Sequence, residues 1–201
     1  MPTVFSASSV VEMELEESLS ESDLGILAGD KSPNGESILV IGKDGYAKQI
    51  SALDAGDRSK DVELITGRNV DLNDVSWHPR GQAALIAGDL GIALRYETSD
   101  HGVTLVNGTG SIIGRNLTTV EWRQAGDYAY FGAEDGGVWK FAEGIGFVAL
   151  DDSRNSSITG ISCHRNIDFC VMSTLQVGLA IISPTHNLTL LSGTSSNTWI
   201  D

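Results

Sequence analysis

The chain has 201 residues, of which 41% are hydrophobic, and this is enough material for a sizeable core. Its 27 acidic and 13 basic residues give a net charge of −14, which argues against nucleic-acid binding, because such surfaces need clustered Lys and Arg. The sequence contains no apolar run of the ~20 residues that a membrane helix requires. It also shows no basic and apolar leader, so we expect a cytoplasmic protein without a membrane span.

The first part of the chain, residues 1–23, is strongly acidic. Six acidic residues and three serines lie between Glu12 and Asp23. Val11, Met13 and Leu15 alternate with acidic residues as they would in a strand, whereas the composition is also that of a disordered tail. Residues 1–23 are therefore interpreted either as a strand or as a disordered tail.

From residue 24 onward the sequence repeats itself. Trp122 follows Trp77 by 45 residues, and Cys163 follows Trp122 by 41. Three further pairs are each separated by 46 residues: Pro33 and Pro79, Gly35 and Gly81, and Gly42 and Gly88. Several anchors that move together at one period indicate a repeat architecture.

Each copy of the repeat contains four short apolar and β-branched runs bounded by Gly, Asp and Asn, which predicts four strands. Four strands per ~40–45 residues are typical of a β-propeller blade, whereas a β-sandwich does not repeat its sequence. We therefore predict an all-β fold, a β-propeller of four antiparallel four-stranded blades with Trp77, Trp122 and Cys163 on the innermost strands. The expected blades are 24–67, 70–107, 117–151 and 158–192.

Four blades are fewer than closed propellers usually contain. Residues 197–201 resemble the start of a fifth blade's first strand, and the alternating residues Val11, Met13 and Leu15 could supply another strand, but two strands of that blade would still be missing. We expect an open arc, a piece of a larger protein, or a ring completed by association. Open sheet edges would then be paired in a homo-oligomer or covered by the N-terminal segment.

One turn resembles a known repeat motif. Thr98-Ser-Asp100-His-Gly102-Val-Thr104-Leu105 follows the Asp-box pattern Ser/Thr-x-Asp-x-Gly-x-Thr-Trp, with Leu105 in place of the Trp. In such a turn we expect Asp100 to accept backbone N–H bonds and Gly102 to adopt a positive φ. The chain therefore resembles Asp-box (BNR-type) propellers and, more loosely, WD-repeat propellers. The resemblance implies a structural role for the box, without catalysis.

The sequence contains no catalytic motif that we can assemble. It lacks the Gly-x-Ser-x-Gly elbow, the phosphate-binding Gly-x-x-x-x-Gly-Lys and the His-Glu-x-x-His zinc motif. Sialidases share the Asp-box propeller, but their arginine triad and tyrosine nucleophile are not recognisable here. We predict no catalytic residues and no cofactor, and a scaffold that binds protein partners through its loops. The alternative is an Asp-box propeller enzyme acting on carbohydrate or another small anionic ligand.

The four histidines could bind a metal, and the two cysteines could form a disulfide. The histidines, His78, His101, His164 and His186, occur at matching places in two blades and could bind a metal together with Asp100. Inheritance of the repeat explains the same positions, so we predict no metal site. Cys163 and Cys170 flank one hairpin, and we expect two buried reduced thiols, because a diagonal pair need not approach within the ~7 Å that a disulfide allows.

A repeated Arg-Asn pair marks the connections between blades. Arg68, Arg115 and Arg154 each precede an Asn between one blade's fourth strand and the next blade's first strand. We expect these arginines to lie on one face, where a cationic arc could bind the carboxylates of a partner's acidic segment or C-terminus. In the interpretation that we favour, the arginines instead pair with acidic residues in the turns between second and third strands and tie the blades together. Those acidic residues are Asp44, Asp89, Glu134 and Asp135.

Overall fold

The computed structural model describes residues 25–53, 57–106, 109–151 and 156–191. The acidic segment 1–23, the strand expected at 197–201 and Arg154 lie outside these residues. No helix in the described part of the chain is long and apolar enough to cross a membrane.

The described residues form four antiparallel sheets, each built from four consecutive strands. Blade 1 contains β1 (Ile26–Lys31), β2 (Ser37–Gly42), β3 (Ala47–Ser51) and β4 (Val62–Glu63). Blade 2 contains β5 (Leu72–Trp77), β6 (Ala83–Gly88), β7 (Ala93–Glu97) and β8 (Val103–Leu105). Blade 3 contains β9 (Leu117–Trp122), β10 (Ala129–Ala133), β11 (Val138–Ala142) and β12 (Gly146–Asp151). Blade 4 contains β13 (Ile158–Cys163), β14 (Cys170–Thr174), β15 (Gly178–Ile182) and β16 (Leu188–Leu190).

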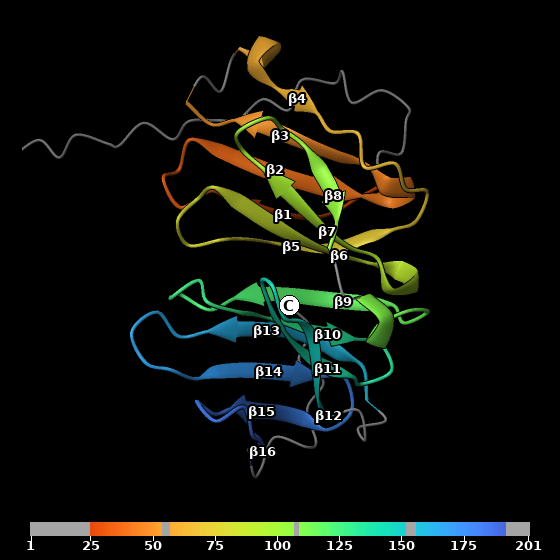
Figure 1. The fold of residues 1–201 in the computed structure, drawn as a ribbon, viewed down its shortest axis with the longest axis vertical. Helices are drawn as coiled ribbons and strands as arrows, with labels where there is room; N and C mark the ends of the chain where they lie inside the picture. The colour runs from red at the N-terminus through yellow and green to blue at the C-terminus, as the bar shows by residue number, and fades with distance from the viewer. Residues whose placement is uncertain (1–24, 54–56, 107–108, 152–155, 192–201) are drawn as a thin grey trace, which may run out of the picture.

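Helical structure in the described residues is limited to four short 3-10 turns. They are η1 (Lys43–Gly45), η2 (Arg58–Lys60), η3 (Asp89–Gly91) and η4 (Thr109–Ser111). The turns η1 and η3 connect the second and third strands of blades 1 and 2, and they occupy the same end of the stacked sheets (Figure 1). The predicted all-β propeller arc is confirmed.

The first strands of the four blades form the inner wall of the arc. β1 packs beside β5, β5 beside β9, and β9 beside β13 (Figure 1). The fourth strand of each blade lies at the opposite edge of its sheet. Trp77, Trp122 and Cys163 are the last residues of β5, β9 and β13. Each pairs with the first or second residue of the second strand in its blade. The prediction that they lie on innermost strands is confirmed.

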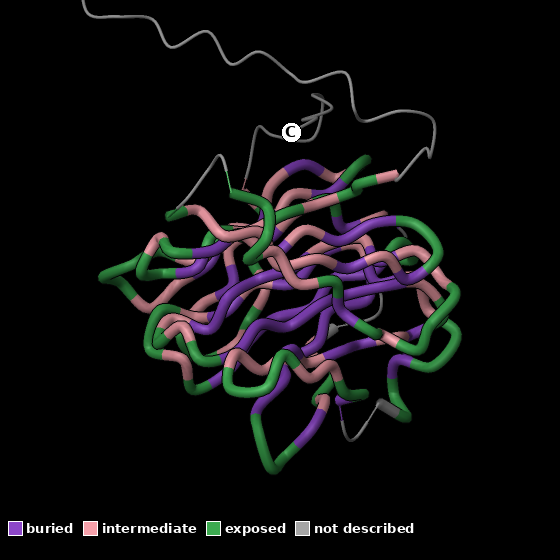
Figure 2. The backbone as a smooth tube through the Cα atoms, turned by 90° about the horizontal axis from the view of Figure 1, so that it is seen from above, coloured by how far each residue is buried: buried purple, intermediate pink, exposed green. Residues whose placement is uncertain are grey.

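Apolar side chains fill the spaces between successive blades. In β6, Ala84 and Ile86 point toward blade 1, whereas Leu85 and Ala87 point toward blade 3, because side chains alternate along a strand. Three such clusters lie at the three blade junctions. Figure 2 shows buried residues running through the middle of the sheets, with exposed residues mostly at the turns. The four sheets do not close into a ring, so blades 1 and 4 are the two ends of the arc (Figure 1).

Candidate functional site

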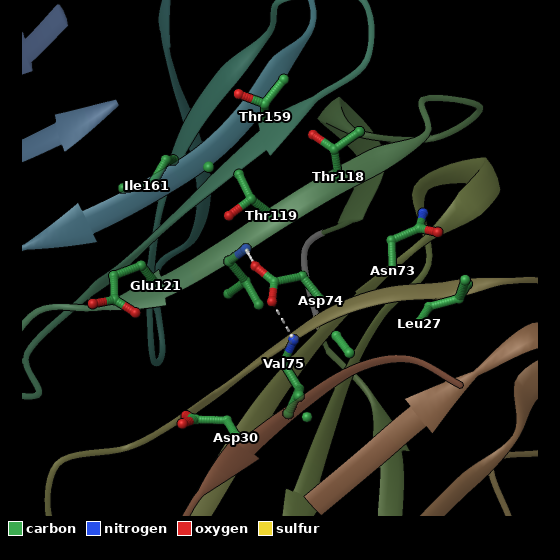
Figure 3. Close-up of a pocket in the computed structure, with 14 residues that line it drawn as sticks. Leu27, Asp30, Asn73, Asp74, Val75, Thr118, Thr119, Glu121, Thr159 and Ile161 are labelled. Carbon is green, nitrogen blue, oxygen red and sulfur yellow. Dashed lines mark hydrogen bonds between the residues drawn. The ribbon is translucent and has the colours of Figure 1, made fainter. Parts of the chain in front are cut away.

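The inner wall encloses a hollow with a polar lining. A space of about 380 Å³ is lined by β1, β5, β9 and β13, and it contains Asp30, Asp74 and Glu121 (Figure 3). A second space of about 420 Å³ shares Asp30 and Glu121 and opens among the turns between first and second strands. Carbohydrate-cleaving enzymes use a pair of carboxylates in such a hollow, so the hydrogen bonds of these three acids decide what they can do.

The inner-wall side chains hydrogen-bond to the backbone of the next blade. Asp30 Oδ2 accepts the N–H of Trp77 at 2.8 Å, and Glu121 Oε1 accepts the N–H of Cys163 at 3.3 Å. Ser76 occupies the same position in blade 2, and its Oγ accepts the N–H of Trp122 at 3.1 Å. We call Asp30, Ser76 and Glu121 the bridging side chains, because each joins two inner strands that share no backbone ladder.

Asp74 makes a further bridge between blades 2 and 3. Its Oδ2 accepts the N–H of Val120 and its Oδ1 accepts the N–H of Val75, both at 2.8 Å (Figure 3). Burial raises the pKa of Asp74 to about 6 and that of Glu121 to about 7, although the hydrogen bonds of both carboxylates act in the opposite direction. These acids therefore hold neighbouring blades together.

The structure places two of the three predicted arginines on the same end of the sheets. This end carries the connections between second and third strands and between successive blades, and we call it the loop face. Arg115 Nη1 lies 2.8 Å from Asp135 Oδ2, and the guanidinium lies over the Trp139 ring, 4.9 Å from its centroid. Arg68 is exposed. Arg154 lies outside the described residues, so the three-membered cationic arc stays a prediction.

Arg68 and Arg115 are not equivalent residues of the structural repeat. Arg115 directly precedes Asn116, whose carbonyl accepts the N–H of Glu134 at 2.9 Å. The equivalent carbonyl in blade 2 belongs to Asp71, which lies three residues after Arg68 and accepts the N–H of Asp89. The repeated Arg-Asn dipeptide is therefore out of register with the structural repeat.

The Asp-box-like turn forms the expected hydrogen bond with a different backbone conformation. Asp100 Oδ1 accepts the N–H of Gly102 at 2.9 Å. The positive φ of 56° falls on His101 and not on Gly102, so that expectation was wrong. A Cβ at Gly102 would lie 2.9 Å from Asp100 Oδ1, so a side chain there would have to shift the Asp100 carboxylate. Thr98 also takes part, with Oγ1 donating to the Gln82 carbonyl, whereas Thr104 is exposed on β8.

The histidines bond to neighbouring side chains and carbonyls at separate places. His101 Nδ1 lies 2.8 Å from the Tyr96 hydroxyl, and His78 Nε2 lies 3.0 Å from the Gly126 carbonyl. His186 bridges blades 3 and 4, with Nδ1 2.8 Å from the Tyr130 hydroxyl and Nε2 3.0 Å from Lys140 Nζ. Burial and the charge of Lys140 lower the pKa of His186. The described residues contain no group of three or more metal-binding side chains placed around one point.

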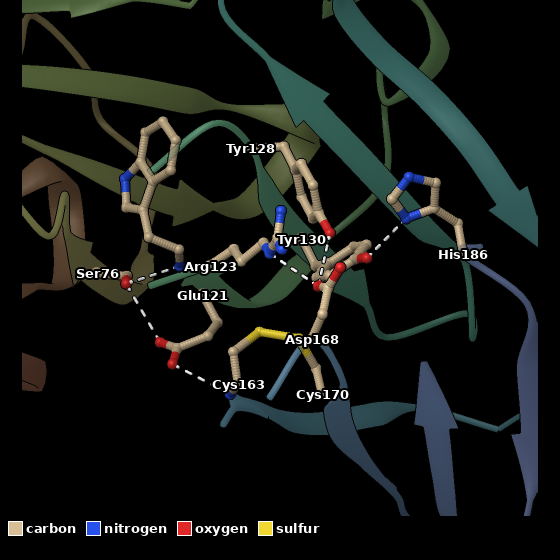
Figure 4. The surroundings of a disulfide bond; sticks show 10 residues. Ser76, Glu121, Arg123, Tyr128, Tyr130, Cys163, Asp168, Cys170 and His186 are labelled. Atoms are coloured by element: carbon tan, nitrogen blue, oxygen red, sulfur yellow. Dashed lines mark hydrogen bonds and ion pairs between the residues drawn. A yellow bond between two sulfur atoms is a disulfide. The ribbon is translucent and has the colours of Figure 1, made fainter. Parts of the chain in front are cut away.

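Cys163 and Cys170 form a disulfide, so the expectation of two reduced thiols was wrong (Figure 4). The two cysteines are directly opposite partners in the β13–β14 ladder, with Cα atoms 4.0 Å apart. A diagonal pair was expected from the sequence, whereas the register of β13 and β14 makes the two cysteines direct partners. The disulfide adjoins the Glu121 bridge, because Glu121 accepts the Cys163 N–H.

Comparison with known proteins supports the fold. The chain matches no protein-family model and no curated protein. Among solved structures it resembles U3-55K, with 12% identity, a TM-score of 0.69, and coverage of 86% of this chain and 53% of that one. It likewise resembles the WD40 repeats of RRP9, with 12% identity, a TM-score of 0.70, and coverage of 87% and 53%. The chain has a WD40-like propeller fold.

A third similar structure is an auxiliary nutrient binding protein from Bacteroides thetaiotaomicron VPI-5482. Identity is 12%, the TM-score is 0.65, and the match covers 89% of this chain and 44% of that one. The chain thus spans about half the length of the structures it resembles. These likenesses show the fold and do not distinguish an Asp-box propeller from other propellers.

Sequence reasoning missed three exposed aliphatic side chains on the loop face. Ile65 is 88% exposed, Ile113 is 71% exposed and Leu90 is 60% exposed. The Leu90 carbonyl accepts the N–H of Gly114 at 3.1 Å, which places Leu90 beside the loop of Ile113. Leu90 also has a φ of 57°, in the left-handed region that bulky residues avoid. Blade 1 has Asp44 in the same conformation, and this mismatch between Asp and Leu at one repeat position was visible in the sequence.

Proposed function

We propose that this chain is a non-catalytic propeller scaffold that binds a protein partner through its loop face. The observation that carries the proposal is Leu90, an exposed leucine held in a left-handed conformation. That conformation costs roughly 1–2 kcal/mol for a residue with a Cβ, and an exposed side chain gains no burial in return. We infer from this cost and from the exposure of the side chain that Leu90 contacts a partner.

The partner we propose is an acidic segment or a C-terminus that also carries apolar side chains. Ile65, Leu90 and Ile113 offer apolar contacts, and the exposed guanidinium of Arg68 can bind a carboxylate with two parallel hydrogen bonds. Arg115 already pairs with Asp135 and Arg154 lies outside the described residues, so Arg68 is the cation on which this proposal rests. The bridging roles of Asp30 and Glu121 favour this scaffold over an Asp-box enzyme, since one oxygen of each carboxylate already accepts a backbone N–H.

A displayed library of random peptides, selected on the wild-type protein, tests the partner class. We expect enriched peptides that combine Asp, Glu or a free carboxyl terminus with apolar residues. Binding of one labelled peptide should weaken about tenfold or more in Arg68→Glu, as at an interface hot spot. Arg80→Glu is the matched control, because Arg80 is exposed in a first-to-second-strand turn at the opposite end of the sheets. Turnover of glycosides by the wild type would contradict the scaffold.

Leu90→Asn separates the role of Leu90 in partner binding from its effect on stability. Asparagine adopts the left-handed region more readily than leucine, so the variant should gain about 1 kcal/mol in the free energy of unfolding. The same variant should bind the labelled peptide about tenfold more weakly, because the apolar contact is lost. Urea unfolding and fluorescence anisotropy measure the two effects. A stabilised variant that binds the peptide as tightly as the wild type would remove Leu90 from the partner site.

A further inference from the structure

The two ends of the arc expose positions that are buried at every internal junction. Leu39, Leu85 and Tyr130 are equivalent residues of the second strands in blades 1 to 3, and they point toward the next blade with 0%, 0% and 1% exposure. The equivalent residue of blade 4 is Val171, which is partly exposed. Blade 4 therefore carries the surface of an internal blade without a following blade among the described residues.

Blade 1 has the complementary surface. Ile86, Phe131 and Met172 point from blades 2 to 4 toward the preceding blade, and each is 0% exposed. Their equivalent in blade 1 is Val40, which is partly exposed. Both ends of the arc thus present apolar positions that the repeat buries elsewhere.

Third-strand residues give the expected pairing across such a junction. Between blades 1 and 2, the Tyr96 hydroxyl donates to Gln49 Oε1 at 3.0 Å. Strand register makes Ile50 of blade 1 the equivalent of Tyr96, and Ile181 of blade 4 the equivalent of Gln49. Both isoleucines are partly exposed. Blade 4 packed against blade 1 would therefore bring two apolar side chains together.

Each end of the arc also carries one half of a hydrogen bond like those that the bridging side chains make at the internal junctions. Ser162 is exposed in blade 4, at the position that the bridging side chains occupy in blades 1 to 3. In blade 1, the N–H of Ser32 donates to the Ser37 carbonyl. Backbone N–H groups alternate in direction along a strand, so the N–H of the preceding Lys31 points away from β2. Lys31 is the equivalent of Trp77, whose N–H is bridged by Asp30. A hydroxyl acceptor at one end thus matches a backbone donor at the other.

A second copy of this chain can supply the neighbour that each end lacks among the described residues. First strands begin 46, 45 and 41 residues apart, so each blade is a repeating unit of about that length. The second copy offers a complete blade 1 to each blade 4. A ring of two arcs would contain eight blades, which lies within the usual range of propellers.

We propose that two copies of this chain close head to tail into one ring, with blade 4 of each copy packed against blade 1 of the other. The two junctions are identical under a twofold axis, so the assembly closes and leaves no open end. The Ser162 hydroxyl of one copy then accepts the Lys31 N–H of the partner subunit, and the inner hollow becomes a complete channel. The ring does not depend on the binding role of the loop face.

Light scattering after size-exclusion chromatography tests the ring with the full chain. We expect twice the 21.3 kDa mass of one chain at micromolar concentration. Ile181→Glu and Ile50→Glu, at opposite ends of the arc, should each weaken dimerisation about 100-fold or more, because each buries a charge in an apolar contact. Ile145→Glu is the control, since Ile145 is 73% exposed in a turn away from both ends. Circular dichroism confirms that each variant is folded.

Cysteine cross-linking decides which surfaces meet. The double variant Ile50→Cys/Ile181→Cys should form covalent dimers with a short thiol-specific linker, whereas each single variant should not, because the two positions meet only across the junction. A monomer at all concentrations, an assembly larger than two copies, or equal cross-linking of the single variants would overturn the proposal. So would a monomer whose ends are covered by its own terminal segments, shown by protection of Ile50→Cys and Ile181→Cys from labelling.

Discussion

Replacing Phe131 with alanine is expected to lower the free energy of unfolding by about 3–5 kcal/mol. Phe131 is 0% exposed in the cluster between blades 2 and 3. Its ring centroid lies 6.3 Å from that of Phe141 and 5.1 Å from that of Phe147, in edge-to-face contacts. Removal of the ring leaves a cavity between two sheets whose ladders resist collapse.

Urea unfolding followed by tryptophan fluorescence measures this loss. Ile145→Ala is the matched control, because Ile145 is 73% exposed and its truncation should change the free energy of unfolding by no more than about 0.5 kcal/mol. If both variants unfolded at the same urea concentration as the wild type, the cluster between blades 2 and 3 would not be the stabilising contact described here.

Glu121→Gln is expected to raise stability at neutral pH and to flatten its pH dependence. Burial raises the pKa of Glu121 from its ordinary 4.5 to about 7. The folded state therefore binds more protons than the unfolded state between these values, and the free energy of unfolding falls as the pH rises through this window. The loss attributable to Glu121 is on the order of 2–3 kcal/mol. Glutamine is neutral throughout, and its amide oxygen can still accept the Cys163 N–H.

Urea titrations at pH 5 and pH 7.5 give the change in the free energy of unfolding between these pH values for each protein. The effect is the difference between that change in the wild type and in Glu121→Gln. The wild type should lose stability between the two pH values, and Glu121→Gln should lose less, while Asp74 keeps part of the dependence because burial raises its pKa to about 6. Glu63→Gln is the control, since Glu63 is exposed. An unchanged pH dependence in Glu121→Gln would show that Glu121 does not titrate differently in the folded state.

The blade architecture could be predicted because its signals are local and repeated. Each strand is a short apolar run bounded by turn residues, and the spacing of Trp77, Trp122 and Cys163 identified the inner strands without any long-range information. The candidate site could be predicted only in part. The loop face followed from the order of strands, so Arg68 and Arg115 were expected at one end, but the Asp135 partner of Arg115 was one of several acidic candidates.

The remaining features depend on register and on contacts distant in sequence. A one-residue difference in hairpin register decides whether Cys163 and Cys170 face each other, and turn residues alone do not set it. Asp30 and Trp77 are 47 residues apart, and Glu121 and Cys163 are 42 apart, so their bridges exist only after the blades have packed. Nothing in the local sequence distinguishes these carboxylates from the other acidic residues.

The sequence by itself determined the number of described blades, the identity of the inner strands and the alternation of buried side chains, because strand periodicity and repeat spacing are properties of neighbouring residues. Tertiary structure alone decided that Asp30, Asp74 and Glu121 bridge blades, that Leu90 is displayed with a positive φ, and that the ends of the arc expose Ile50 and Ile181. The physical reason is that the burial and the hydrogen bonds of a side chain depend on which blade lies beside its own. The repeated sequence gives every blade the same apolar faces, whether or not a neighbouring blade is present to cover them.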